Sequence, residues 1–142
     1  MKYSKATDNA LHTMVYLMTL PEGDRIGVQS LAEIQKLSPT YLSKILTKLA
    51  QAGLIESVRG VKGGYRVSEP KDSISFLDVI KAIEGDSSLF SCSMNHNEGC
   101  MIESVMAKAE QNMKDELSHQ YLMDMVYKME QHHMNSTKNK EN

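Results

Sequence analysis

The sequence of 142 residues contains no tryptophan, and it has only two cysteines, three prolines and two phenylalanines. Two cysteines are too few for the disulfide framework of a small secreted domain, so these thiols are candidates for ligands or redox-sensitive groups. No apolar run approaches the length of a membrane-spanning helix, and the first ten residues lack the apolar core of a secretory signal. These absences predict a cytoplasmic chain with no membrane partner, and its length suits one domain.

The charged residues divide the chain into two unlike halves. Residues 1–68 carry nine Lys and Arg and five Asp and Glu, whereas residues 69–142 carry seven and thirteen. The first half therefore has a net charge of +4 and the second a net charge of −6. A basic half followed by an acidic half is typical of a polyanion-binding module joined to a segment with another role.

The most informative stretch runs from Ser38 to Val67, SPTYLSKILTKLAQAGLIESVRGVKGGYRV. Ser38 is a favourable N-cap, and Pro39 suits the first helical position, where a backbone N–H is not needed. Gly53 is placed to end that helix, and strand-like segments follow on both sides of a glycine-rich turn. The pattern therefore predicts a helix, a strand, a turn and a second strand. The apolar stripe of the helix consists of Leu42, Ile45, Leu46 and Leu49.

A shorter helix is predicted over residues 28–35, joined by a tight turn to the helix that begins at Pro39. Two helices with such a turn form a helix-turn-helix, whose second helix lies in the DNA major groove with its N-terminal residues nearest the bases. Tyr41 also has a second interpretation, as a ring packed in the core. Hydrogen-bond donors and positive charges recur on the outer helix face and at the hairpin tip. The candidates for DNA contact are Ser38, Pro39, Thr40, Tyr41, Ser43, Lys44 and Lys48 on the helix, and Arg59, Gly60, Lys62 and Arg66 on the hairpin.

Apolar periodicity predicts three more long helices, at residues 5–20, 74–84 and 100–117, with Ser73 as the N-cap of the second of these. A short final helix is predicted to begin after Ser118. The methionine-rich stripe of the last helices is too long for the rest of the chain to cover, so we expect a dimer interface there. A monomer with the long helix folded back is the alternative.

The words AGLIESVRGVKGGYRVSEP and ISFLDVIKAIEG resemble the Rrf2 family of bacterial winged-helix transcription factors. That family includes an iron–sulfur cluster regulator and a nitric-oxide-sensitive repressor, and the resemblance extends from residue 1 to about residue 130. It implies that Arg59 approaches the minor groove, where the enhanced negative potential suits arginine. With the residue patterns, it predicts a mainly α fold with a small β-hairpin. The expected parts are a winged helix-turn-helix DNA-binding domain (1–84), a sensor loop (85–100), dimerisation helices (101–130) and a disordered tail (131–142).

The same resemblance implies a sensor in the loop, where members with an iron–sulfur cluster carry three closely spaced cysteines and one non-cysteine ligand. This chain departs from that pattern, because it has Cys92 and Cys100 but no third cysteine. Three alternatives stay open: an iron–sulfur cluster or metal completed by other ligands, a thiol switch, or no cofactor at all. The additional candidate ligands are His96 in the loop, and Asp8 and His12, which share a face of the first helix. Asp8 and His12 can equally form a surface ion pair.

The sequence therefore predicts a homodimer that binds a palindromic operator in double-stranded DNA, with two recognition helices about 34 Å apart. The expected role is a sequence-specific transcriptional repressor that responds to a redox, iron–sulfur, nitrosative or thiol signal through the Cys92–Cys100 segment. The alternative is a winged-helix adaptor that binds an acidic protein surface without DNA specificity. An enzyme is not predicted, because the sequence has no nucleophile with an ordered base, no phosphate-cradling loop and no His-Glu metal motif.

Overall fold

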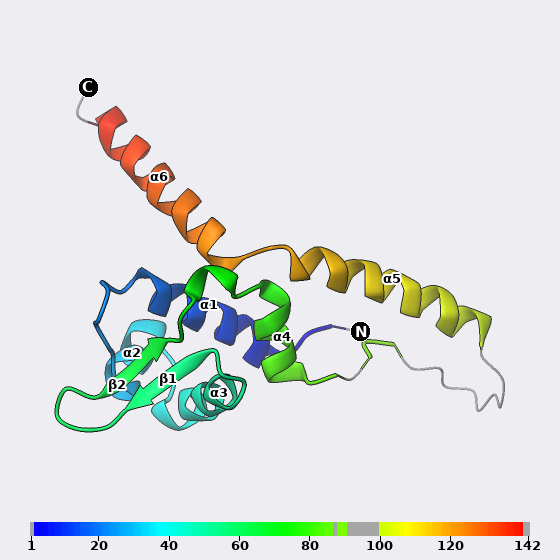
Figure 1. Ribbon diagram of the computed structural model, residues 1–142, viewed down its shortest axis with the longest axis horizontal. Coiled ribbons are helices and arrows are strands. Elements are labelled where there is room, and N and C mark those ends of the chain that lie inside the picture. The colour runs from blue at the N-terminus through cyan, green and yellow to red at the C-terminus, as the bar shows by residue number, and fades with distance from the viewer. Residues whose placement is uncertain (1, 87, 91–99, 141–142) are drawn as a thin grey trace.

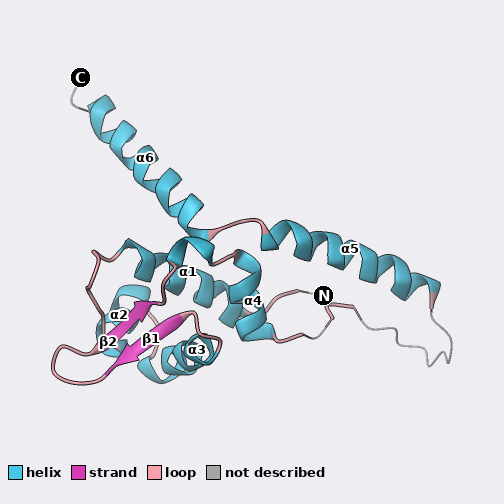
Figure 2. Cartoon of the chain, in the orientation of Figure 1, coloured by secondary structure: helices cyan, strands magenta, loops and turns pink. Residues whose placement is uncertain are grey.

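A computed structural model describes residues 2–86, 88–90 and 100–140 of the chain. Helices α1 to α4 and a two-stranded hairpin form one body, from which α5 and α6 project in different directions (Figure 1). Figure 2 shows that the hairpin supplies the strands of this otherwise helical chain, which confirms the predicted fold class. The elements are α1 (Lys5–Thr19), α2 (Val28–Gln35), α3 (Pro39–Gln51), β1 (Ile55–Val58), β2 (Gly64–Val67), the 3-10 helix η1 (Lys71–Ser73), α4 (Phe76–Glu84), α5 (Met101–Ser118) and α6 (Leu122–Lys140).

The core lies where α1 packs against α3, α4, the hairpin and the beginning of α6. The apolar stripe predicted for α3 is fully buried, and α1 contributes its own buried stripe at helical spacing. Helices α1 and α3 each begin at a side-chain cap: the Ser4 hydroxyl accepts from the N–H of Thr7, and the Ser38 hydroxyl accepts from the N–H of Tyr41. Within the described residues, no helix is both long and apolar enough to cross a membrane.

The hairpin is antiparallel, with Ile55 opposite Val67 and Glu56 opposite Arg66. It is also joined to the α1–α2 link by two backbone hydrogen bonds, since the N–H of Tyr65 donates to Ile26 at 2.8 Å and the N–H of Ile26 donates to Tyr65 at 3.2 Å. Ile26 therefore forms an isolated antiparallel β-bridge with Tyr65 of β2. The projecting turn between β1 and β2 is the wing of a winged helix-turn-helix.

The fourth helix begins later than the sequence predicts. Ser75 rather than Ser73 is its N-cap, and the Ser75 and Asp78 side chains bond each other's backbone N–H groups in a capping box. The hydroxyl of Ser73 instead donates to the carbonyl of Pro70 at 2.8 Å, inside η1. The helix buries Val79, Ile80 and Ile83, whereas Phe76 and Leu77 are only half-buried.

The last helix is longer than expected. Ser118 ends α5, and α6 begins at Leu122, where two backbone bonds join residues 120–122 to residues 74–76. Leu122, Met123 and Val126 are buried against the body, so the first turns of α6 are anchored. The sequence predicted a disordered tail over residues 131–142, but residues 131–140 continue α6 as a helix. A formed helix extends at little cost through residues that tolerate helical conformation, even without burial.

Candidate nucleic-acid interface

The helix-turn-helix is formed by α2, the turn at residues 36–38 and α3. Lys36 ends α2 in a left-handed conformation with φ of 57°, and the N–H of Leu37 donates to the carbonyl of Ala32 at 3.0 Å. This closed turn fixes the angle at which α3 leaves α2. The structure therefore brings the predicted N-terminal residues of the recognition helix to one exposed end, with Ser38, Thr40 and Lys44 open to solvent.

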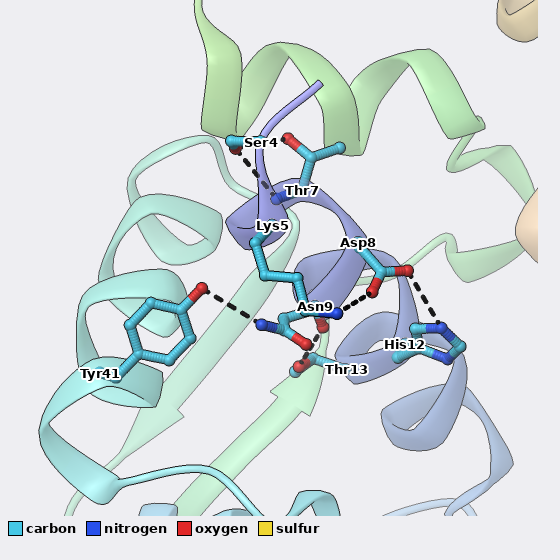
Figure 3. A network of polar contacts seen from close by, with 8 residues as sticks. All are labelled: Ser4, Lys5, Thr7, Asp8, Asn9, His12, Thr13 and Tyr41. Carbon is cyan, nitrogen blue, oxygen red and sulfur yellow. Dashed lines mark hydrogen bonds and ion pairs between the residues drawn. The ribbon is translucent and has the colours of Figure 1, made fainter. Parts of the chain in front are cut away.

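Tyr41 differs from its neighbours because its ring packs against the core. Its hydroxyl oxygen accepts a hydrogen bond from the Asn9 side-chain amide at 3.2 Å (Figure 3). On α1, which also carries Asn9, the buried Thr13 hydroxyl lies 2.7 Å from the Asn9 carbonyl and 2.9 Å from Oε1 of Gln35 in α2. Polar groups of α1 thus hold both helices of the helix-turn-helix, and this geometry supports the packing interpretation of Tyr41.

The wing carries its basic residues at an exposed tip. Arg59, Gly60 and Lys62 are exposed, and the N–H of Gly63 donates to the carbonyl of Gly60 at 2.9 Å to close the turn. Neither Arg59 nor Lys62 forms an ion pair with any residue that the structure describes, and the same holds for Lys44 on α3. Unpaired cations on a helix face and a neighbouring hairpin are suited to phosphate oxygens and base edges.

One of the predicted DNA contacts, Arg66, has another partner, and Lys48 lies near a carboxylate. Nε of Arg66 donates to Oε2 of Glu56 at 2.9 Å across the hairpin, in a concave surface that three further carboxylates also line. Lys48, in the last turn of α3, lies close enough to Glu84 for its positive charge to contribute to lowering the pKa of that carboxyl. Arg66 therefore differs from Lys44, Arg59 and Lys62, whereas Lys48, like those three, forms no ion pair with any residue that the structure describes.

Glu84 joins the end of α4 to the beginning of α1. Its Oε1 accepts from the Thr7 hydroxyl at 2.6 Å and from the backbone N–H of Ser4 at 2.7 Å. The Thr7 bond is the main cause, and the Ser4 bond the next, of the lowered pKa of the Glu84 carboxyl. Sequence analysis missed both Glu84 and Asn9 as positioning residues. The sequence did contain a sign of these contacts, because Thr7 and Thr13 are two polar residues within the apolar stripe of α1 and need hydrogen-bond partners there.

The candidate sensor residues are only partly described. Cys92 and His96 lie outside the described residues, and Cys100 is a half-buried residue at the N-cap position of α5. Asp8 and His12 form an exposed ion pair with Nε2 of His12 3.3 Å from the carboxylate, and Nζ of Lys5 lies 3.4 Å from the same side chain. Figure 3 shows this pair on the side of α1 away from Tyr41. The surface-pair interpretation is therefore satisfied within the single chain.

An iron–sulfur cluster needs a converging set of donors, which this chain does not present in the part that is described. No group of three or more His, Cys, Asp or Glu side chains comes together among residues 2–86, 88–90 and 100–140. The two thiols of the chain also fall short of the three cysteines that the family resemblance implies. The described donors do not fit such a group by themselves.

A family model and several solved structures match this chain over most of its length. The family model for Rrf2, described as an iron-dependent transcriptional regulator, matches residues 3–128. Among solved structures, the oxidized form of CymR from Staphylococcus aureus is 31% identical with a TM-score of 0.72, and the match covers 89% of this chain and 96% of that chain.

Two further structures match at similar levels. CymR (YrzC), the global cysteine regulator of B. subtilis, is 25% identical with a TM-score of 0.74, covering 89% of this chain and 97% of that one. IscR of T. potens is 26% identical with a TM-score of 0.73, covering 91% of this chain and 88% of that one. The matches span nearly the whole chain in both directions, so the winged body and the projecting helices belong to one shared fold.

Proposed function

The chain belongs to the Rrf2 family of transcriptional regulators, and from this premise we propose that it binds operator DNA as a homodimer and represses transcription. The observation that carries the proposal is that Thr40 and Lys44 are exposed on the N-terminal half of α3, while the wing cations Arg59 and Lys62 have no ion-pair partner among the described residues. In this proposal α3 enters the major groove, and Arg59 at the wing tip approaches the minor groove. Such a regulator works in the cytoplasm, where a bacterial chromosome lies.

The homodimer is supported by the exposed apolar side chains of the projecting helices. No residue of α5 is buried, and Met101, Ile102 and Val105 on its first turns are 84%, 67% and 69% exposed. Met129 and Met134 on α6 are also more than half exposed. Side chains of this kind gain about 1.5–3 kcal/mol each when they are fully buried, so a second copy of these helices is a favourable partner. A two-fold dimer would present two α3 helices to a palindromic operator.

The proposed signal is a redox, iron–sulfur, nitrosative or thiol signal received by the Cys92–Cys100 segment. The two thiols lie in the segment between α4 and α5. Glu84 holds α4 to α1, and we assign α5 to the dimer interface. A chemical change at that segment would therefore act between the DNA-binding body and the dimer. Visible absorption after anaerobic purification, with iron and sulfide analysis, separates a cluster from a thiol switch.

The test of DNA binding is fluorescence anisotropy with a labelled duplex from the region upstream of the gene. Replacing Arg59 or Lys44 by alanine should weaken binding about tenfold or more, because each substitution removes a charge placed against the duplex. Lys138→Ala is the matched control, since Lys138 lies near the exposed end of α6, and it should bind like the wild type.

Three results would count against the proposal. Wild-type affinity in both Arg59→Ala and Lys44→Ala would show that the interface is wrongly assigned. Absence of a specific complex at moderate salt, for the wild-type chain itself, would favour the adaptor that binds an acidic protein surface. A sedimentation measurement that finds only monomer, with and without the duplex, would remove the dimer from the proposal.

A further inference from the structure

The link between α1 and α2 brings an additional cation to the wing. Residues 20–27 cross beside the hairpin, and the two backbone bonds between Ile26 and Tyr65 fix them there. Gly64 permits this contact, because a Cβ at that position would lie 2.7 Å from the carbonyl carbon and oxygen of Ile26. The side chain of Arg25, one residue before the paired position, is therefore placed by the same contact that positions the wing.

Arg25 lies in a concave surface that is completed by the wing tip. The surface is lined by Gly23, Asp24 and Arg25 from the link and by Val61, Lys62 and Gly63 from the turn between β1 and β2. Two positive side chains thus share one hollow, with the Asp24 carboxylate as its only lining anion. Asp24 does not come within ion-pair distance of Arg25 or of Lys62 in the described structure.

The guanidinium of Arg25 has an unmet hydrogen-bonding demand. Its Nε is fully shielded and has no hydrogen-bond partner, and the residue forms no ion pair with any part of the chain that the structure describes. A shielded donor without a partner is rare in folded proteins and calls for a specific explanation. The shielded Nε is not itself open to a ligand, so a phosphate in the hollow would meet the terminal N–H groups of the guanidinium, which form a fixed fork that matches phosphate oxygens.

We propose that Arg25 is a phosphate-contacting residue of the wing, which together with Lys62 receives a backbone phosphate of the operator and fixes how the wing sits on the duplex. This inference rests on the proposed DNA binding and adds to it a contact outside α3 and the hairpin. The contact is to the sugar–phosphate backbone, so it positions the wing and does not select a sequence. The sequence alone gave no reason to assign Arg25, which lies outside the helix-turn-helix and hairpin motifs.

Arg66 offers a matched comparison within the same chain. It lies on the adjacent strand, but its Nε donates to Glu56 at 2.9 Å, so its charge already has a partner. Arg25 and Arg66 are the same residue type and both are partly buried; Arg66 belongs to β2, and Arg25 precedes the residue that pairs with β2. They differ in whether an internal carboxylate satisfies the guanidinium, and only the unsatisfied one is assigned to DNA.

The experiment measures binding of the full-length chain to the upstream duplex and to a scrambled duplex across a range of salt concentrations. Arg25→Gln keeps most of the side chain but removes the charge, once in each protomer. The slope of log K against log salt should fall by about 1.8 for the dimer, since each lost phosphate contact contributes about 0.9. Affinity should fall about 100-fold at ~50 mM salt and about tenfold at ~200 mM, equally for both duplexes.

Two further variants complete the test. Arg25→Lys should keep the wild-type salt slope, because it keeps the charge, while losing part of the affinity because it lacks the fork. Arg66→Gln should keep both slope and affinity within about twofold of the wild type. A merely structural role for Arg25 would lower the thermal midpoint of the free protein and leave the slope unchanged, which would overturn the inference.

The outcomes separate this inference from the proposed function. If Arg59→Ala loses binding while Arg25→Gln binds with the wild-type slope, the Arg25 contact is wrong and the DNA interface stands. If Arg66→Gln loses as much as Arg25→Gln, the effect is one of net charge, and the assignment of the hollow is wrong. If the wild-type chain binds neither duplex, the proposed function fails and this inference fails with it.

Discussion

Replacing Gly64 by alanine is expected to detach the wing from the α1–α2 link. Gly64 has a φ of +146°, a conformation that residues with a side chain rarely adopt. A Cβ there would lie 2.7 Å from the carbonyl carbon and oxygen of Ile26 and 3.0 Å from the nitrogen of Gly27. All three are backbone atoms, so no change of rotamer relieves the overlap, and the two segments must move apart.

The cost follows from what that movement breaks. The two backbone hydrogen bonds between Ile26 and Tyr65, at 2.8 and 3.2 Å, contribute about 0.5–1.5 kcal/mol each. The ring of Tyr65 packs against the core and would lose part of that contact. Keeping the bonds instead would retain backbone strain of about 1–3 kcal/mol together with the overlap. Either route gives a loss of about 3 kcal/mol in the free energy of unfolding.

The measurement is urea unfolding followed by far-ultraviolet circular dichroism, at one fixed protein concentration. Gly53→Ala is the matched control, because Gly53 also has a positive φ, +78°, but nothing lies within 4 Å of an added Cβ. It should lose only about 1 kcal/mol, the cost of the left-handed conformation. The difference of about 2 kcal/mol then measures the close approach of the wing to the link. Equal losses in the two variants would refute the idea that this approach holds the wing.

Two other predictions concern the polar contacts of α1. Glu84→Gln should lower the free energy of unfolding at pH 7 by about 1 kcal/mol, because a charged acceptor is lost from the Thr7 and Ser4 bonds. The folded-state pKa of Glu84 is lowered. The difference in free energy of unfolding between wild type and variant should therefore be full above the ordinary carboxyl pKa of about 4.3, and it should vanish as the pH falls through the folded value. A difference that stays constant in urea titrations at acid pH would contradict this. Tyr41→Phe should cost about 1 kcal/mol by leaving Asn9 unpaired while keeping DNA affinity within about twofold, and a large affinity loss at unchanged stability would restore the DNA-contact role.

The parts of the fold that local chemistry specifies were predictable from the sequence. The bounds of α2 and the first residue of α3 agree with prediction. Ser38, Pro39 and Gly53 mark the ends of α3 by capping rules that need no distant partner. The hairpin was predictable for the same reason, since its turn glycines are local signals. The ion pair between Glu56 and Arg66 was also within reach, because these residues face each other once the register is known.

Long-range contacts decided most of the features that sequence reasoning missed. The cap of α4 had a local signal that was overlooked, because Ser75 has Asp78 three residues later, the spacing of a capping box, whereas Ser73 has Phe76 there. The pairing of residues 74–76 with residues 120–122 is a long-range contact that also favours Ser75. The hydroxyl of Tyr41 meets Asn9, 32 residues earlier, so neither periodicity nor side-chain type could choose between its two roles. Arg25 becomes a candidate DNA contact only because the α1–α2 link lies beside the wing, and that is a tertiary contact.

The apolar stripe of α5 is visible in the sequence, but its exposure is visible only in the structure. Periodicity shows that the helix has an apolar side, and the structure shows that the chain itself leaves Met101, Ile102 and Val105 exposed. Most of the stability of an amphipathic helix comes from packing of its apolar face, and α5 has no buried residue to supply it. The stripe therefore predicts a partner surface of similar apolar character. A second α5 meets that requirement by symmetry, because in a two-fold interface each surface is its own complement.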